Sequence, residues 1–218
     1  MLHWNTVNDL LKNCLVRLME APELASFRLV GGTALSLHLG HRISVDLDLF
    51  TDAPYESIDF DKIEDFLKAS FNHVDGNFGS KPGMGKSYLI GSDPENLVKL
   101  DIYYSMDPFI HKPVTVQNIR LANIEDIIAM KLDIFQRAGR KKDFWDLHEL
   151  LTNRSIKKML AFHKKRCEWT HDENLIIANL TDFSRADLDP DPICLMGKEW
   201  IFIKEDFEAA IGNSKNDK

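Results

Sequence analysis

The chain has 218 residues, and its 34 acidic and 27 basic side chains give a formal net charge of -7. This balance excludes wholesale coating of nucleic acid, although a local basic patch remains able to bind RNA. The 44% of hydrophobic residues suffices for an ordinary globular core. The three cysteines lack metal-type spacing, and their odd number suits reduced thiols in a cytosol. We see no signal peptide and no apolar run near the ~20 residues that span a bilayer, so we expect a cytoplasmic protein.

The first half of the chain alternates between predicted helices and strands. Apolar residues recur at helical spacing over residues 6–20, and Pro22 ends that helix. The segments that follow are a strand over 27–30, a short helix over 33–39, a strand over 44–50, a helix over 59–71, strands near 73–79 and 86–91 on either side of a glycine-rich passage, and strands over 96–104 and 113–122.

From residue 124 onward the pattern changes to helices. The predicted segments are 124–138, 141–151, 155–167 and 173–180, whereas residues 182–218 show only one short apolar patch, EWIFI. Strands before helices favour an α/β (α+β) fold, with a strand-rich half followed by a helical half. We place the boundary near Asn123 and expect domains over 1–122 and 123–218.

The segment VDLDLF holds the clearest chemical signal. In a strand, residues two apart share a face, so Asp46 and Asp48 point one way while Leu47 and Leu49 point the other. Neighbouring carboxylates repel unless a cation or a proton intervenes, and Mg²⁺ prefers oxygen ligands of this kind. The alternative is a half-exposed strand whose polar face carries two acids by chance.

Three further features favour a metal-dependent phosphate site over that alternative. Gly31, Gly32 and Thr33 form a turn that opens a helix, where backbone N–H groups bind phosphate. Arg42 and Ser44 lie on the approach to the acids and can donate to phosphate oxygens. A third acid, Asp101, sits in the alternating segment NLVKLDIYY, and three carboxylates suffice for two ions roughly 4 Å apart.

The ordered series GGTAL…HRISVDLDLF, VKLDIYY and IEDIIAMKLDIFQRAGRKKDFWDL resembles the nucleotidyltransferases of the AbiEii/AbiGii toxin family. This family belongs to the DNA-polymerase-β-like nucleotidyltransferase superfamily, and the similarity covers about residues 27–151. The resemblance implies a mixed sheet flanked by helices, followed by a helical half that supplies a lysine and a further acid. It also implies a toxin of a toxin–antitoxin or phage-defence pair, with an antitoxin as partner.

The resemblance also implies roles for single residues. Asp46, Asp48 and Asp101 become metal ligands, Lys131 the triphosphate-binding lysine and Asp143 the late acid of the K-D-x-x-D-L motif. Gly31, Gly32 and Ser44 become phosphate contacts. Many superfamily members open with Gly-Ser where this chain has Gly-Gly-Thr, and Thr33 is the hydroxyl available in its place.

Two interpretations stay open for the basic residues. Lys131 lies beside an apolar stripe and is either a solvated helix residue or the partner of a triphosphate. The runs RAGRKK (137–142) and KKMLAFHKKR (157–166) are either solvated helix faces or a cradle for an RNA end.

These patterns predict a Mg²⁺-dependent nucleotidyltransferase that moves NMP from an NTP to an acceptor hydroxyl. The family resemblance implies RNA, and specifically tRNA, as the acceptor. Two alternatives remain: a small-molecule nucleotidyltransferase of the aminoglycoside type, and a catalytically silent nucleotide-binding module.

Overall fold

A computed structural model describes residues 1–216 of the chain, with side chains as far as residue 212. The chain divides into two compact units. Unit 1 comprises residues 1–39 and 44–123, and unit 2 comprises residues 40–43 together with the chain from Ile124 onward. The segment 40–43 therefore belongs with the helices of unit 2, although the sequence places it in the strand-rich half. The division into domains over 1–122 and 123–218 stays a prediction.

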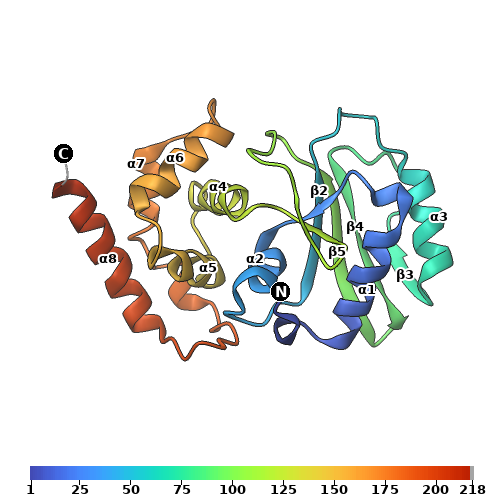
Figure 1. Ribbon diagram of the computed structural model, residues 1–218, viewed down its shortest axis with the longest axis horizontal. Coiled ribbons are helices and arrows are strands. Elements are labelled where there is room, and N and C mark those ends of the chain that lie inside the picture. Colours follow the sequence, from blue (N-terminus) through green and yellow to red (C-terminus); the bar gives the residue numbers. More distant parts are fainter. Residues whose placement is uncertain (217–218) are drawn as a thin grey trace. The chain divides into compact units, whose positions relative to one another are not determined.

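Unit 1 is built around a seven-stranded mixed sheet with the strand order β3-β4-β5-β2-β1-β7-β6. Two neighbouring pairs, β2 with β5 and β1 with β7, run parallel, and the other pairs run antiparallel. The predicted mixed α/β fold is thus confirmed. The elements of this unit (Figure 1) are η1 (Trp4–Thr6), α1 (Asp9–Glu20), η2 (Pro22–Leu24), β1 (Arg28–Leu29), α2 (Gly31–Leu39), β2 (Asp46–Thr51), α3 (Phe60–Ser70), β3 (His73–Gly76), β4 (Gly85–Asp93), β5 (Asn96–Tyr104), β6 (Val114–Val116) and β7 (Ile119–Leu121).

One face of this sheet is buried and the other carries the acids. Along β2, Leu47 and Leu49 are fully buried, whereas Asp46 and Asp48 are partly exposed. Helix α1 contacts β2, β4 and β5 on the buried side, and the ring of Phe60 in α3 lies 6.2 Å from that of Tyr104. Helices α1 and α3 therefore cover the apolar face, and the alternation of residues along each strand leaves the acids on the opposite face.

The structure corrects the single strand that the sequence predicts over 113–122. This segment is a hairpin, in which β6 and β7 pair antiparallel. Gln117 and Asn118 connect the two strands with φ of 51° and 63°. Two consecutive residues with positive φ produce the tight turn that matches strand twist, and asparagine tolerates this backbone conformation better than most residues.

Unit 2 consists of helices α4 (Ile124–Phe135), α5 (Lys141–Leu151), α6 (Ile156–Arg166), α7 (Glu173–Asn179), η3 (Ala186–Leu188) and α8 (Trp200–Asn216) (Figure 1). Helix α4 packs against α6 and α7, and α5 packs against α8. The ring of Phe144 makes the centre of this core, at 4.6 Å from Phe135 and 5.4 Å from Phe207. The sequence does not predict helix α8, although Ile203, Phe207 and Ile211 recur every four residues along its buried face. None of the helices in residues 1–216 is long and apolar enough to cross a membrane.

Candidate functional site

Three carboxylates lie on the open face of the sheet in unit 1. Strands β2 and β5 pair in parallel, and this register makes Asp101 the partner of Asp48 and Lys99 the partner of Asp46. Neighbouring strands are about 4.8 Å apart, so Asp48 and Asp101 are separated by a single strand spacing. Alternation puts both on the face that also carries Asp46. The two segments are about 50 residues apart in the sequence, and the sheet brings them together.

Lys99 supplies a cation at this cluster. Its Nζ lies 2.5 Å from Asp101 Oδ2, and half of its side chain is exposed. The hydrogen bond to Asp101 raises the pKa of the Lys99 ammonium, and the charges of Asp101, Asp48 and Asp46 raise it further. The charges of all three acids therefore act together on this ammonium, as expected for carboxylates that lie close to one another.

The second carboxylate oxygen of Asp101, Oδ1, is available for a further contact. Among the described residues, its buried Oδ1 has no hydrogen-bond partner. A buried carboxylate oxygen without a donor is unfavourable unless a cation or a proton occupies the adjoining space. The donor set of the cluster consists of carboxylate oxygens, which suit a hard divalent cation such as Mg²⁺.

Gly31 lets the start of helix α2 approach the acids closely. Its φ is +68°, and a Cβ added there would lie 2.6 Å from Asp48 Oδ2. The N–H of Val30 also donates to the carbonyl oxygen of Asp48, at 2.8 Å. Only glycine combines this left-handed backbone with so short an approach. The predicted turn at Gly31 and Gly32 thus forms the first residues of α2 itself, beside the carboxylate of Asp48.

The two hydroxyls near the acids bind to each other. Thr33 is 1% exposed, and its hydroxyl shares a 2.8 Å hydrogen bond with Ser44 and donates to the carbonyl oxygen of Asp46. Ser44 is also buried. In this structure both side chains therefore attach α2 to the start of β2, and their contact with phosphate stays a prediction.

Unit 2 contains a second set of predicted site residues, held in a buried network of ion pairs. Lys131 in α4 is 4% exposed, and its Nζ lies 2.6 Å from carboxylate oxygens of both Asp143 and Asp146 in α5. Asp143 also accepts from the backbone N–H and the side chain of Arg140, both at 3.1 Å, and so caps the start of α5. The structure excludes the interpretation of Lys131 as a solvated helix residue, and its role in triphosphate binding stays a prediction.

Asp146 is the centre of this network. Arg42 donates to its two oxygens at 2.6 and 2.8 Å, in the bidentate geometry that suits a guanidinium. His41 Nε2 lies 2.8 Å from the same carboxylate. The sequence does not predict this role for Asp146, whose one signal is its position three residues after Asp143. Arg42, predicted as a phosphate contact, is 4% exposed and bound to this acid.

The network fixes the charge of its members. Burial opposes ionisation of Asp146, but Lys131 and Arg42 prevail and hold its pKa well below the usual range. For Asp143 burial likewise opposes ionisation, and Lys131 and Arg140 lower the pKa. Burial disfavours the Lys131 ammonium, yet the two carboxylates raise its pKa. All three groups are therefore charged near neutral pH.

Most of the chain matches the model of a known protein family. Residues 13–214 match the family model described as "Nucleotidyl transferase AbiEii toxin, Type IV TA system". A protein of Aquifex aeolicus (strain VF5) is 29% identical over 166 residues, which are 73% of this chain and 75% of that protein.

Two solved structures share the fold. The crystal structure of JHP933 from Helicobacter pylori has a TM-score of 0.58 at 19% identity, over 96% of this chain and 90% of that one. MenT4, a nucleotidyltransferase toxin from Mycobacterium tuberculosis H37Rv, has a TM-score of 0.52 at 14% identity, over 89% and 82% of the two chains.

Proposed function

We propose that this chain, which belongs to the AbiEii family of nucleotidyltransferase toxins of type IV toxin–antitoxin systems, uses Mg²⁺ to transfer NMP from an NTP to an RNA hydroxyl. The family implies an NTP substrate and an antitoxin partner. The observation that carries the finer proposal is the row of Asp46, Asp48 and Asp101 on adjoining strands, with Asp101 Oδ1 unpartnered among the described residues.

The three acids would hold the divalent ions. Bound there, Mg²⁺ neutralises phosphate charge and lowers the pKa of an acceptor hydroxyl. The acceptor oxygen then forms a bond to the α-phosphorus, the bond from that phosphorus to the bridging oxygen breaks, and pyrophosphate leaves. We assign the hydroxyl proton to Asp101, whose buried Oδ1 accepts no hydrogen bond from the residues that the structure describes.

The chain's cations would stabilise the charge on the leaving pyrophosphate. We assign this role to Lys131, Arg42 and the backbone N–H groups at Gly31 and Gly32. Lys131 and Arg42 are each paired with buried carboxylates, so binding a phosphate requires that they exchange one carboxylate oxygen for a phosphate oxygen. Asp143 and Asp146 act as positioning residues in this scheme.

RNA as the acceptor rests on the basic residues of unit 2. Helix α6 presents four exposed lysines, Lys157, Lys158, Lys164 and Lys165. Two other members of the predicted basic runs do not contribute, because Lys141 and Arg166 are buried. Clustered lysines in a chain of net charge -7 form a local site for a phosphate backbone. The proposed substrates, NTPs and tRNA, put the site of action in the cytoplasm.

The test is transfer of label from α-labelled NTPs, with Mg²⁺, to total tRNA or to an aminoglycoside. We expect label on tRNA. We also expect the tRNA-binding constant to fall with added salt, by about 0.7 to 0.9 log units per log unit of salt concentration for each phosphate contact. The double variant Lys157→Glu/Lys158→Glu should lose most tRNA labelling. Lys62→Glu, a 73% exposed lysine of α3, is the matched control and should keep it.

Two outcomes would contradict this proposal. Label on the aminoglycoside alone would favour a small-molecule transferase. No label on either acceptor with any NTP, from a folded protein, would favour the catalytically silent module.

A further inference from the structure

Unit 2 contains a group of side chains of the types that bind metal ions, distant in sequence from the acids of unit 1. It consists of Asp133 in α4, His163 in α6 and Cys167, the residue that ends α6. One ligand atom from each lies within 4.8 Å of the other two. The His163 side chain is fully buried, Cys167 is buried, and the Asp133 side chain is 31% exposed. The group therefore joins two packed helices and opens to solvent on the Asp133 side.

Local structure explains why the three residues meet. His163 and Cys167 are four residues apart, so they share one face at the end of α6. Helix α4 packs against α6 and presents Asp133 to that face. Arg137 donates to Asp133 Oδ2 at 2.7 Å and Gln136 donates to Oδ1 at 3.2 Å, so both residues orient the carboxylate. Oδ1 lies on the side of the His163 imidazole, 3.9 Å from its Nε2.

The imidazole of His163 provides the observation that points to a ligand. Within residues 1–216, its buried Nε2 has no hydrogen-bond partner. The nearest carboxylate oxygen, Asp133 Oδ1, is 3.9 Å away, which is too long for a hydrogen bond. This spacing is close to the roughly 3.3–3.8 Å that separates two ligands of one tetrahedral zinc ion with bond lengths of 2.0–2.3 Å.

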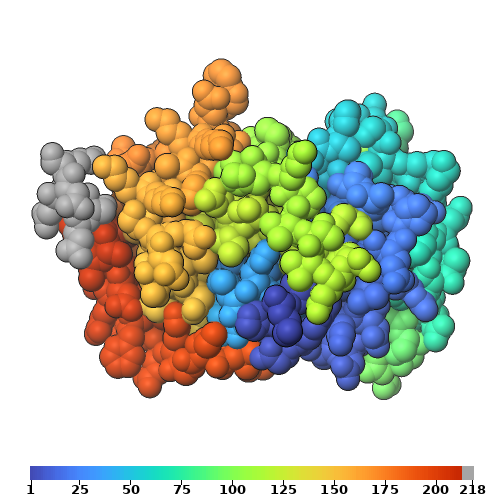
Figure 2. All heavy atoms as spheres, in the orientation of Figure 1, coloured from blue at the N-terminus to red at the C-terminus, as the bar shows by residue number. Residues whose placement is uncertain are grey.

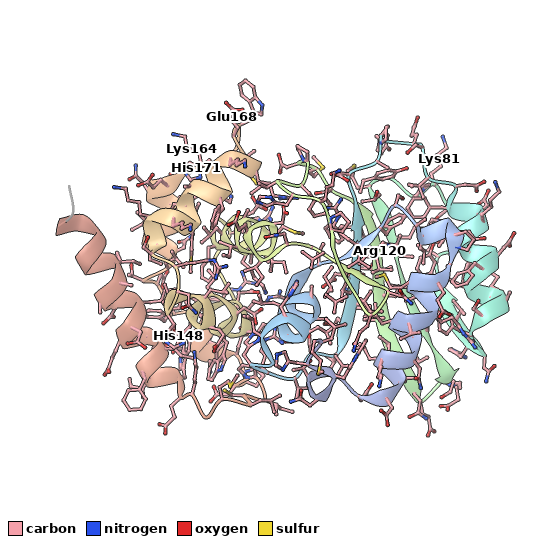
Figure 3. All side chains as sticks on the ribbon, in the orientation of Figure 1. Lys81, Arg120, His148, Lys164, Glu168 and His171 are labelled. Atoms are coloured by element: carbon pink, nitrogen blue, oxygen red, sulfur yellow. The ribbon has the colours of Figure 1, made fainter. Side chains whose placement is uncertain are left out.

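The other ring nitrogen has the partner that a metal-binding histidine requires. His163 Nδ1 lies 2.7 Å from Nδ1 of His171, and such a bond needs one donor and one acceptor. With His163 as donor, its Nε2 carries a lone pair directed toward Asp133 and Cys167. A hydrogen bond from the second nitrogen is the usual means of fixing the tautomer and orientation of a metal ligand. Figure 3 shows His171 at the surface beside Lys164 of α6.

The three residues between Cys167 and His171 are exposed. They project from the surface as an orange tip in Figure 2, and Trp169 among them is 93% exposed. At the base of this tip, Arg166 donates to Cys167 Sγ at 3.6 Å.

We propose that Asp133, His163 and Cys167 bind one Zn²⁺, with water as the fourth ligand. Oxygen, nitrogen and sulfur ligands together suit this borderline-soft ion, and the carboxylate and thiolate balance its charge. The ion ties the end of α6 to α4, two residues from Lys131, and stabilises unit 2 by binding only the folded chain. The site is independent of the proposed transfer reaction.

Cobalt provides the direct test, because Co²⁺ bound by a thiolate absorbs in the near ultraviolet through charge transfer from sulfur. We expect the metal-stripped full chain to bind one Co²⁺ with this band, and Zn²⁺ to displace it. Asp46→Ala/Asp48→Ala should keep the band, because the acids of unit 1 contribute no sulfur. Cys194→Ser is the matched control and should keep it as well.

The ligand variants should behave differently. Cys167→Ser should abolish the band while its circular dichroism stays that of the wild type. Asp133→Asn, at a partly exposed ligand, should weaken Co²⁺ binding at least about tenfold. A band that persists in Cys167→Ser, or a folded wild type that gives no band at saturating Co²⁺, would overturn the proposal.

Discussion

Replacing Asp146 by asparagine tests the buried network most sharply. The substitution keeps the size of the side chain and removes one negative charge. Lys131 would then keep its ion pair with Asp143, whereas Arg42, which is 4% exposed, would lose its bidentate ion pair with Asp146. Breaking a buried pair by removing one partner costs about 3–5 kcal/mol, because the remaining charge stays desolvated. We therefore expect Asp146→Asn to lower the free energy of unfolding by this amount, out of roughly 5–15 kcal/mol for a typical domain.

The measurement is urea unfolding followed by the fluorescence of the tryptophans, of which Trp145 is 2% exposed and stacks on Trp200 in unit 2. Asp206→Asn is the matched control, because Asp206 pairs with His148 at 2.8 Å but is 62% exposed. This exposed pair should contribute at most about 1 kcal/mol. Equal and small losses from Asp146→Asn and Asp206→Asn would refute the view that the network stabilises unit 2.

Acid gives an independent check of the same network. The folded pKa of Asp146 lies well below its ordinary value, so its contribution is present above the unfolded pKa and is lost as the pH falls through the folded pKa. The stability gap between wild type and Asp146→Asn should therefore be widest near neutral pH and shrink below about pH 4. A gap that stays constant on acidification would show that the loss has another cause.

Three further substitutions probe single contacts. Gly31→Ala should reduce transfer by about a hundredfold, because the added Cβ displaces the Asp48 carboxylate. The control Gly197→Ala, at a similar φ of +65° but with open space around it, should lower stability and leave transfer unchanged. Equal transfer activities of the two variants would contradict this prediction. Lys99→Ala should lower the Mg²⁺ concentration for half-maximal activity by up to about fivefold, since an exposed ammonium contributes at most ~1 kcal/mol, and an increase would argue against competition between Lys99 and the metal. Lys131→Met should raise KM for NTP at least about tenfold, by loss of a charge-assisted hydrogen bond, and a folded variant with wild-type kcat and KM would leave Lys131 a purely structural role.

Local patterns predict most of the fold. Alternation predicts β5 over residues 96–104, and helical spacing predicts α5 over 141–151, both as observed. The hairpin at Gln117 and Asn118 escapes prediction because its turn lacks the usual glycine. Helix α8 escapes prediction because its apolar residues are sparse: beyond the patch EWIFI and as far as residue 212, only Phe207 and Ile211 are buried along it.

The candidate site, like the fold, is predicted by the sequence only where local patterns determine it. The period of two along β2 puts Asp46 and Asp48 on one face, and this follows from the sequence alone. The placement of Asp101 opposite Asp48 depends on pairing between distant strands, which no local pattern encodes. The same holds for Asp146, because its partners Arg42 and Lys131 come from segments about 100 and 15 residues earlier in the chain.

The fate of the two ends of the triphosphate tests the central claim, that Asp46, Asp48 and Asp101 serve attack at the α-phosphorus. NTP labelled at either the α- or the γ-phosphate is incubated with the protein, Mg²⁺ and total tRNA. The wild type should place the α label on tRNA and release the γ label in pyrophosphate. Asp101→Asn should do neither, while Asp75→Asn, at an exposed acid of β3, should match the wild type. Transfer of the γ label to the acceptor, or wild-type transfer of the α label by folded Asp101→Asn, would contradict the account.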